Sequence, residues 1–542
     1  MNRNIAAVSF FAGLLIFVSA QAQERQKPTS KVEAASSCKE FAPPPKQAAG
    51  KNIGVEECRI VSEEVVFNIK GQRVQRLELR IGGTLEGWAA KEGPRTNYFT
   101  DGPDIVFTQS GNTSRRFKGI AKYEGATGHG VSLFFPENQA HWNGKLFVTA
   151  HGAGAYGAVG TLLPRDPNAD FNALTNVNKY VGLMVDKGYA VAHTMRSSQR
   201  VGGDVSLTLE DGTTPAKLNL SSHAGFILGL TKITENILRA KLGRNPQRTY
   251  FYGFSAGGFL GRLIQYHPGF NRDDDGSPVF DGFLLDDAGG GMWLPVLMKD
   301  GKDALFIQDE DKKRFVKQID ISHQLYAGET NDYIQKKREN AKILKQKGLA
   351  SNHRMYEVKG VSHFDAGQVS LPELVFQGLD LGGLLDSLID SLDQWVEGGK
   401  EPPLTRSDLL ELGAGNPAIA LPEIACPLGV YHIFPAALGK GRRAGQETGF
   451  AAFDGVGLEP LDGRGEFVDM NGNGVRDRRE TVDQAWTRLG LLTSGEKFTR
   501  SKYISCVSST AAKLAGAGLL PSKLVAYYVK KATASKVGEG DR

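Results

Sequence analysis

The sequence predicts an α/β protein whose central sheet is mostly parallel and carries helices on both faces. Between about residues 130 and 403, short apolar segments alternate with longer segments of helical periodicity, which is the pattern of a parallel sheet with helical crossovers. The aromatic segment 250–252 leads through a tight turn into a helical pattern and is one unit of that alternation. Over about 53–122, polar and apolar residues alternate with a period of two, which predicts a β-rich N-terminal extension. A C-terminal extension of 404–542 follows.

The first 22 residues are predicted to be a secretory signal peptide. Arg3 supplies a positive charge, residues 5–18 are almost wholly apolar, and Ala20-Gln21-Ala22 forms a small-x-small cleavage site. The apolar run is shorter than the roughly 20 residues that a membrane helix needs, and no later run is long enough. We therefore expect a secreted or periplasmic chain with no integral membrane segment after cleavage. Its expected parts are the N-terminal extension 23–122, a central α/β domain 123–403 and the C-terminal extension 404–542.

The central domain 123–403 is predicted to contain six strands in chain order. They span residues 146–150, 189–192, 250–252, 282–285, 321–326 and 355–358. Apolar residues at helical spacing predict a long helix around 226–237 and a closing helix over about 384–396. Polar residues follow three of the strands directly, namely His151, His193, Asp286 and Asp287.

Ser255 lies in the most informative motif of the chain, Gly253-Phe254-Ser255-Ala256-Gly257. An aromatic strand precedes it and small residues opening a helical pattern follow it, so the serine occupies a sharp turn from strand to helix. Glycine suits the flanks of so tight a turn, which presents the hydroxyl above the sheet in front of a helix N-terminus. This context favours a nucleophilic serine over a structural glycine-rich turn.

The order of four motifs resembles that of the α/β-hydrolase superfamily. They are HGAG at 151–154, GFSAG at 253–257, GETND at 328–332 and GVSHF at 360–364. The resemblance covers about residues 130–403 and implies the α/β-hydrolase fold. The C-terminal segments CPLGVYHIFP and GVGLEPLDGRGEFVDMNGNGVRDRRET are similar to those of a group of secreted α/β-hydrolase-domain proteins.

A catalytic serine needs a base, and the base needs a carboxylate that orients it. The superfamily's chain order of serine, acid and histidine indicates His363, which follows an apolar strand on a Gly-Val-Ser loop. Asp332 is the preferred acid and Glu329 the alternative, because both follow the strand 321–326. The usual loop spacing would place the acid one residue before Asp332, so the choice stays open. Asp286 or Asp287 is a more remote candidate.

Backbone N–H groups are expected to hold the oxyanion that develops during acyl transfer. Ala256, directly after the nucleophile, supplies one of them. The small residues of the HGAG motif allow a second N–H, from Gly152 or Ala153, to approach the same point. The competing interpretation of HGAG is a plain glycine-rich turn.

Residues 469–480 have the EF-hand calcium pattern, with oxygen-bearing side chains at loop positions 1, 3, 5, 9 and 12 and glycine at position 6. The predicted ligands are the side chains of Asp469, Asn471, Asn473 and Glu480, the carbonyl of Val475, and Asp477 through a water molecule. Position 8 is the charged Arg476, and no helical pattern precedes the loop. We therefore expect a lone structural Ca²⁺ rather than a paired sensor, with an empty turn as the alternative. No cofactor is expected for catalysis.

The chain contains four cysteines, Cys38, Cys58, Cys426 and Cys506, and an even count fits an oxidising compartment. Pairing Cys38 with Cys58 and Cys426 with Cys506 is favoured, because each bond would cross-link one peripheral segment. Four free buried thiols are the alternative. The net charge of +5 includes no basic stripe with interleaved aromatic residues, which argues against nucleic acid as a partner.

These observations predict a secreted serine hydrolase that cleaves carboxylic esters, small or polymeric, through an acyl-enzyme intermediate. A peptidase or amidase would use the same triad, and cleavage of amides without esters would identify it. A non-catalytic binding protein on the same scaffold would lack a working acid. The substrate itself depends on loops whose arrangement does not follow from sequence spacing.

Overall fold

The computed structural model describes residues 36–42, 46–48, 51–86, 105–109, 113–121, 129–151, 163, 165–166, 168, 179–195, 205–209, 222–266, 271–273, 275–287, 296–299, 302–305, 309–324, 332–361, 379–432, 457–460, 467–468, 477–478 and 481–535. All structural statements below refer to these residues. The expected signal peptide lies outside them.

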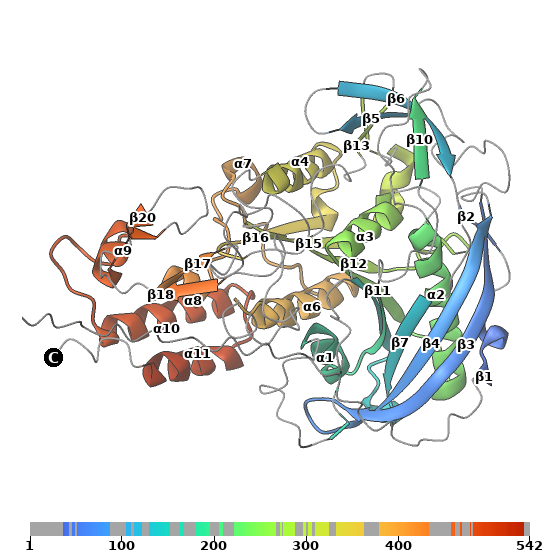
Figure 1. The fold of residues 1–542 in the computed structure, drawn as a ribbon, viewed down its shortest axis with the longest axis horizontal. Coiled ribbons are helices and arrows are strands. Elements are labelled where there is room, and N and C mark those ends of the chain that lie inside the picture. The colour runs from blue at the N-terminus through green and yellow to red at the C-terminus, as the bar shows by residue number, and fades with distance from the viewer. Residues whose placement is uncertain are drawn as a thin grey trace, which may run out of the picture.

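A sheet of eleven strands forms the centre of the molecule (Figure 1). Its strands are β1 (Ser36–Ser37), β2 (Lys46–Ala48), β3 (Lys51–Phe67), β4 (Arg73–Glu86), β7 (His129–Pro136), β8 (Lys145–His151), β9 (Ala190–Met195), β11 (Arg248–Phe254), β12 (Gly282–Asp286), β15 (Lys317–His323) and β16 (His353–Val358). They lie in the order β1-β3-β4-β7-β9-β8-β11-β12-β15-β16, with β2 paired to β3. The strands from β9 to β16 run parallel, and those from β7 to β1 continue the sheet in antiparallel pairing. The predicted α/β class is confirmed.

Helices cover both faces of this sheet. One face carries α2 (Ser222–Leu242), α3 (Ala256–Tyr266) and α4 (Asp332–Gln346), and the other carries α1 (Lys179–Asp186) and α6 (Gly382–Val396). Successive side chains of a strand point to opposite faces, and on β11 both sets are apolar. Phe251 packs with α2 and α3, whereas Tyr250 and Tyr252 pack with α1 and α6. This two-sided burial explains why the sequence shows continuous apolar runs.

The N-terminal β-rich extension continues the central sheet. β3 and β4 are 17 and 14 residues long and pair with each other, and β4 pairs with β7. The side chains of β4 that face the core, among them Leu77, Leu79 and Ile81, are buried with residues of α2. The disulfide between Cys38 and Cys58 ties the chain before β2 to β3.

A second sheet of five strands is assembled from three separate insertions. It consists of β5 (Ile105–Gln109), β6 (Thr113–Ala121), β10 (Val205–Leu209), β13 (Val296–Lys299) and β14 (Lys302–Leu305), in the order β10-β6-β5-β13-β14. The insertions follow β4, β9 and β12, whose carboxyl ends all lie at one edge of the central sheet because these strands run in the same direction. The second sheet therefore belongs to the edge at which the parallel strands end.

The C-terminal extension begins along the free edge of β16. Residues 405–426, called the strap below, form parallel bridges between Arg406 and Tyr356 and between Ile419 and Val358. The strap contains the short helices α7 (Leu410–Gly413) and α8 (Pro422–Ala425). The remaining described elements of the C-terminal extension are β17 (Gly429–His432), β18 (Gly457–Pro460), β19 (Phe467–Val468), β20 (Asp477–Arg478), α9 (Val482–Arg488), α10 (Arg500–Gly516) and α11 (Lys523–Ala534). The described 3-10 helices precede this extension and are η1 (Lys39–Phe41), η2 (Gln139–His141), η3 (Asp309–Arg314) and η5 (Ala350–Asn352).

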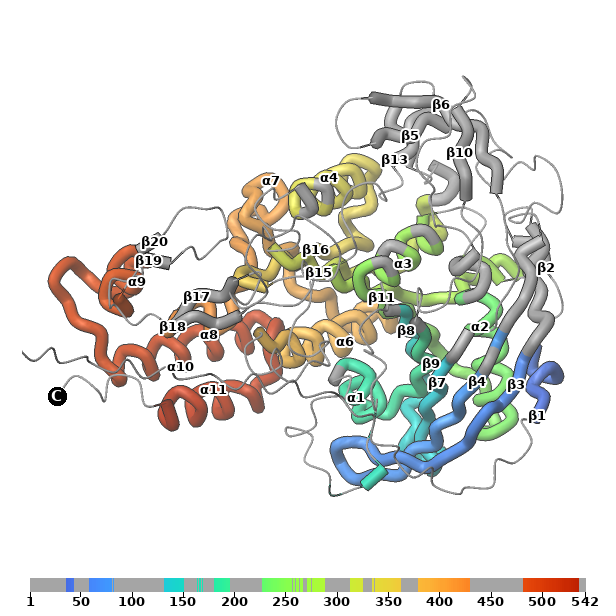
Figure 2. The backbone as a smooth tube through the Cα atoms, in the orientation of Figure 1, coloured from blue at the N-terminus to red at the C-terminus, as the bar shows by residue number. Residues whose placement is uncertain are grey.

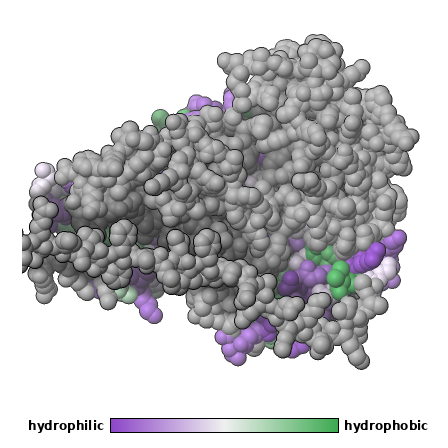
Figure 3. Space-filling view, viewed as in Figure 1, coloured by the Kyte–Doolittle hydropathy of each residue, from purple (hydrophilic) through white to green (hydrophobic). Residues whose placement is uncertain are grey.

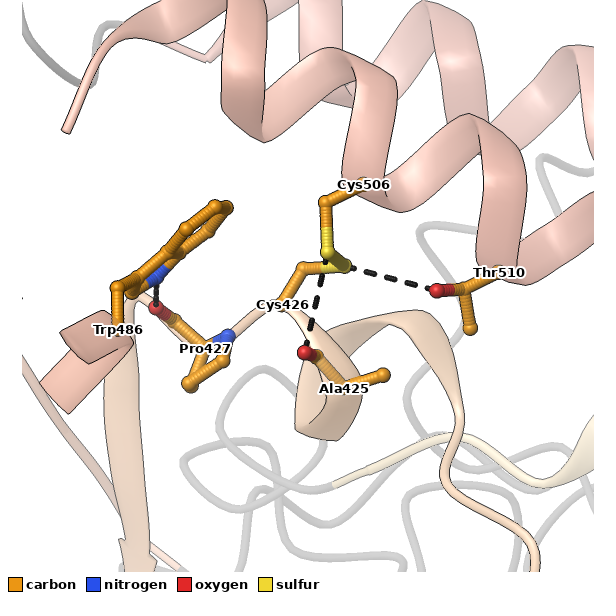
Figure 4. The surroundings of a disulfide bond; sticks show 6 residues. All are labelled: Ala425, Cys426, Pro427, Trp486, Cys506 and Thr510. Atoms are coloured by element: carbon orange, nitrogen blue, oxygen red, sulfur yellow. Dashed lines mark hydrogen bonds between the residues drawn. A yellow bond between two sulfur atoms is a disulfide. The ribbon is translucent and has the colours of Figure 1, made fainter. Parts of the chain in front are cut away.

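Helices α10 and α11 lie side by side at the end of the molecule away from the N-terminal strands (Figures 1 and 2). They share a small apolar core with α8 and α9 that contains Trp486, Val507 and Leu520. The disulfide between Cys426 and Cys506 joins this core to the strap, and Trp486 lies beside it and donates its indole N–H to the carbonyl of Pro427 at 2.9 Å (Figure 4). Both disulfides are the pairs favoured by the sequence.

The described surface is mainly hydrophilic on the side seen in Figure 3, with a small hydrophobic area at its lower right. Large apolar side chains that are exposed among the described residues are spread over the N-terminal strands, the strap and the C-terminal helices, for example Val61, Leu410 and Tyr527. Within the described part of the chain, no helix combines the length and the apolar character needed to cross a bilayer.

Candidate active site

Ser255 occupies a strained turn between β11 and α3. Its φ angle is +57°, a left-handed conformation that costs a residue with a side chain of order 1 to 3 kcal/mol and persists only where the surroundings enforce it. The backbone N–H of Ser255 donates to the carbonyl of Asp286 at 2.9 Å, so the neighbouring strand β12 holds the turn. The side chain is 8% exposed, at the carboxyl edge of the parallel strands.

Two glycines make the turn possible, as the sequence predicts. A Cβ on Gly257 would overlap the backbone carbonyl of Ala150 on β8, and a Cβ on Gly253 would overlap the backbone of Gly257. Helix α3 therefore starts in direct contact with the end of β8. Ala256 is the first residue of α3, and the first N–H groups of a helix have no acceptor within the helix. N–H groups in this position can bind an anion, which is the role expected of Ala256.

Several of the predicted site residues lie outside the described part of the chain, although the strands that lead to them are described. These residues are Gly152, Ala153, Glu329 and His363. β8, β15 and β16, which precede them, end at the same edge of the sheet as β11 because all four run parallel. The strand positions are therefore compatible with a site that gathers around Ser255.

The strand before the predicted acids begins and ends earlier than expected. β15 spans Lys317–His323 instead of 321–326, and Asp332 is the first residue of α4. The discrepancy arises because β15 alternates apolar residues with Gln318, Asp320 and Ser322, which are polar and yet buried. A polar residue at every second position is typical of a strand with one exposed face. The sequence pattern therefore did not indicate the first half of β15, which is buried on both faces.

A buried cluster of charged groups lies at the ends of β12 and β15. It consists of Asp286, Asp287, His323 and Lys337, each 2% exposed or less, and is called the elbow cluster below. The Asp286 carboxylate accepts a hydrogen bond from the Tyr252 hydroxyl at 2.8 Å, and its Oδ1 lies 3.0 Å from His323 Nε2. Thus one carboxylate links β11, β12 and β15 next to the serine turn.

Asp287 fixes the other side of the elbow cluster. Its φ angle is +42°, its N–H donates to the carbonyl of Ile321 at 2.9 Å, and its carboxylate accepts the backbone N–H of His323 at 3.0 Å. The same carboxylate pairs with the Lys337 ammonium from α4. Burial lowers the pKa of Lys337, and the ion pair with Asp287 opposes that shift. Asp286 and Asp287 therefore both connect the end of β12 to neighbouring elements at this edge of the sheet.

A second buried network lies on the opposite face of β15. Asp320 accepts from Arg262 Nη2 at 2.9 Å, from Gln318 at 2.8 Å, and lies 2.7 Å from His353 Nε2. Burial by itself would raise the pKa of Asp320, but Arg262, His353 and Gln318 outweigh it and hold that pKa below its usual range. Burial raises the pKa of the nearby Tyr266 to about 12. This network ties β15 to α3 and β16 away from the serine turn.

His193 lies within β9, which extends to Met195 and so beyond the predicted strand 189–192. It is buried, with its Nδ1 2.7 Å from Thr149 Oγ1. Burial lowers its pKa from 6.5 to about 4. Between pH 6.5 and pH 4, His193 is therefore protonated in the unfolded chain and neutral in the folded chain. The stabilisation is complete above pH 6.5 and is lost as the pH falls to about 4, with a total of about 3 kcal/mol.

Replacing His193 by Asn is expected to remove this pH dependence. Between pH 7 and pH 4, the free energy of unfolding of the variant should fall by about 3 kcal/mol less than that of the wild type, as measured by urea denaturation. His141→Asn is the control, because His141 is exposed and its removal should leave the wild-type loss intact. Equal losses in wild type and His193→Asn would contradict a neutral buried His193.

Sequence reasoning missed two members of the elbow cluster, His323 and Lys337, and considered Asp286 and Asp287 only as candidate triad acids. One signal was present, because Asp286 and Asp287 directly follow an apolar strand. The partner Lys337 lies 50 residues away from Asp287 on a polar helix. Nothing in that helix distinguishes one lysine from its neighbours, so the ion pair emerges only from the packing of α4 on the sheet.

Comparison with known proteins addresses the fold. Residues 229–452 match the model of a family described as alpha/beta hydrolase domain. Among solved structures, the chain is similar to esterase B from Lactobacillus rhamnosis HN001, with 14% identity, a TM-score of 0.29 and coverage of 50% of this chain and 81% of that chain. It is also similar to an acylaminoacyl peptidase from Pyrococcus horikoshii, with 12% identity, a TM-score of 0.30 and coverage of 69% and 59%. Such low values carry no information on the substrate. No curated protein matches the sequence.

Proposed function

We propose that this chain, whose residues 229–452 match an alpha/beta hydrolase domain, is a serine hydrolase that cleaves carboxylic esters through an acyl-enzyme intermediate. The observation that carries the proposal is the left-handed backbone of Ser255 at the carboxyl edge of the parallel strands. Strain at a buried turn that neighbouring strands enforce is characteristic of functional positions. In this turn the strain presents the serine hydroxyl in front of the N-terminus of α3.

In the proposed reaction, Ser255 Oγ attacks the ester carbonyl while His363 takes its proton. The N–H of Ala256 and an N–H from Gly152 or Ala153 stabilise the negative charge on the carbonyl oxygen. His363 then protonates the leaving alcohol and activates the water that releases the acyl group, while Asp332 or Glu329 orients the imidazole. The elbow cluster supports this choice of acid, since Asp286 and Asp287 are already bound to Tyr252, His323 and Lys337.

A fluorophosphonate probe tests the reaction class, because it reacts with an activated serine. The purified chain is expected to be labelled at Ser255, as located by mass spectrometry, and to hydrolyse nitrophenyl esters. A matched panel of nitroanilides separates an esterase from a peptidase or amidase. A folded chain that neither reacts with the probe nor cleaves either panel would contradict the proposed reaction class and favour a non-catalytic binding protein.

Residues 469–480 are proposed to hold a structural Ca²⁺. Most of this loop lies outside the described residues, including Asp469, Asn471, Asn473, Val475 and Glu480. Val468 before the loop and Asp477–Arg478 within it are described, and β19 pairs with β20 so that Val468 lies opposite Asp477. The pairing brings the two ends of 469–476 together, as a closed oxygen-rich loop requires. Thr481 directly after the loop caps α9 in a capping box with Gln484, so an ordered loop would fix the start of that helix.

Calcium is expected to stabilise the helices that follow the loop. With a Kd near 10⁻⁴ M, as in extracellular calcium modules, 10 mM Ca²⁺ should stabilise the folded loop by about 2.7 kcal/mol. Hydrogen exchange of α9, α10 and α11 should slow in Ca²⁺ relative to EGTA, and the Asp469→Ala and Glu480→Ala chains should not respond. Exchange that is the same with and without Ca²⁺ in the wild type would exclude a structural ion.

The two disulfides support an oxidising compartment for the folded chain. Bonds between Cys38 and Cys58 and between Cys426 and Cys506 persist where the surroundings are oxidising. We therefore infer a secreted or periplasmic enzyme. Its substrate is proposed to be a small-molecule or polymeric ester.

A further inference from the structure

The strap is fixed to the strand that leads toward the proposed catalytic base. The N–H of Glu357 donates to the carbonyl of Arg406 at 3.0 Å, and the N–H of Lys359 donates to the carbonyl of Ile419 at 2.8 Å. The strap thus takes the place of a further strand along the edge of β16 and satisfies its backbone groups. Its contact continues past the end of β16, to Lys359.

Glu357 anchors the strap in the interior. This side chain is fully buried on β16 and accepts hydrogen bonds from Ser407 Oγ at 2.5 Å and from the N–H of Asp408 at 3.1 Å. Arg338 of α4 binds both of its oxygens, at 2.7 and 2.9 Å. Bidentate pairs of this kind impose a defined geometry. Arg338 therefore holds the Glu357 carboxylate in place, and Glu357 in turn fixes the position of Asp408 relative to the sheet.

Asp408 joins the starts of two loops. Its Oδ2 accepts from Gln324 Nε2 at 3.0 Å, and its Oδ1 lies 3.2 Å from Lys359 Nζ. Gln324 is the first residue after β15, on the way to the proposed acid, and Lys359 is the first residue after β16, on the way to the proposed base. Burial would raise the pKa of Asp408, but the hydrogen bonds from Gln324 and the backbone and the charge of Lys359 outweigh it and lower that pKa.

Ile424 packs directly on the turn that precedes the proposed base. Gly360 has a φ angle of +69°, and a Cβ at this position would overlap Ile424 Cδ1. Val361, the next residue, is buried in the core cluster that also contains Leu421 of the strap. The strap therefore contacts both Lys359 and Gly360, and Cys426 at its end is bonded to Cys506 of α10.

We propose that Asp408 and Ile424 of the strap are positioning residues for the catalytic base and acid. They determine where the segments that lead to His363 and to Asp332 or Glu329 leave the sheet, and this inference rests on the proposed function. Asp408 is about one-third exposed, and exposed ion pairs contribute little to stability. Misplacing a catalytic group by about 1 Å, in contrast, costs up to about 10²-fold in rate. The effect of these residues should therefore appear in turnover.

Four substitutions in the strap test the proposal. In Asp408→Ala and Ile424→Ala, kcat for a nitrophenyl ester should fall about 10-fold to 100-fold, while KM stays within about 2-fold because the residues do not contact substrate. The rate of fluorophosphonate labelling should fall in parallel. Asp408→Asn keeps an acceptor for Gln324 and Ile424→Val keeps most of the contact with Gly360, so both should retain most of the activity.

Glu411→Ala and Leu410→Ala are the controls, since both residues lie on the same strap and are exposed, and the Glu411 side chain pairs with Lys342 of α4. Their kcat should equal that of the wild type. If Asp408→Ala and Ile424→Ala also keep the parental kcat, the positioning role is wrong. If Ile424→Ala fails to fold, the comparison of kcat between Asp408→Ala and Asp408→Asn tests the positioning role. A wild-type chain that neither labels nor hydrolyses esters overturns the proposed function, and the role of the strap with it.

Discussion

Ser255→Ala is expected to lose about 10⁶-fold in kcat for ester hydrolysis. The hydroxyl is the only group removed, and the left-handed turn remains because Gly253 and Gly257 still allow α3 to contact β8. The variant should bind substrate with a normal KM and should no longer react with a fluorophosphonate. Rates over a range of enzyme concentrations, with active-site titration of the wild type, measure this loss.

Ser322→Ala is a suitable control for that experiment. Ser322 is fully buried at the same end of the sheet, on β15, but belongs to the face occupied by Asp320 rather than to the serine turn. Its removal should leave labelling unchanged. Parental labelling and hydrolysis in Ser255→Ala would refute the assignment of the nucleophile.

Removing the disulfide between Cys426 and Cys506 is expected to destabilise the C-terminal helices by about 4 to 5 kcal/mol. The bond closes a loop with a sequence separation of 80 residues, and loop-closure entropy for that length has this magnitude. The small core around Trp486 has little apolar area with which to compensate. In the chain with both cysteines replaced by Ala, hydrogen exchange of α10 and α11 should accelerate about 10³-fold.

Replacing Cys38 and Cys58 by Ala provides the matched comparison. That bond closes a separation of 20 residues, which corresponds to about 3 kcal/mol, and it lies in the N-terminal strands. Exchange should accelerate there and stay slow in α10 and α11. Unchanged exchange of α10 and α11 after loss of the Cys426 to Cys506 bond would mean that their apolar contacts alone hold them.

The disulfide between Cys426 and Cys506 is also expected to affect kcat, because it holds the end of the strap. Cys426 lies two residues after Ile424, which packs on Gly360. If the strap positions the base, loss of this bond should therefore lower kcat as well as the stability of the C-terminal helices. Loss of the N-terminal disulfide should leave kcat unchanged, since Cys38 and Cys58 lie at the opposite end of the sheet order.

The sequence was sufficient for features that depend on neighbouring residues. Strands buried on both faces show as apolar runs, and a turn with no room for side chains requires glycine, so β11, Ser255 and α3 were predictable from residues 248–263. The cysteine pairing was favoured because each bond closes one peripheral segment. The turn at Ser255 and its flanking strand and helix follow from backbone sterics and burial, which act over a few residues.

Other features depend on contacts between residues that are far apart in the sequence and meet only in the folded chain. Asp287 and Lys337 are 50 residues apart, and Gln324 and Asp408 are 84 apart, so no local pattern connects them. A buried polar group needs a partner, and that partner can come from any element that packing brings within about 3 Å. The proposed reaction class rests on local chemistry at the serine turn. The groups that hold its strands and loops in place were decided by tertiary structure, because only the assembled sheet determines which distant side chains meet.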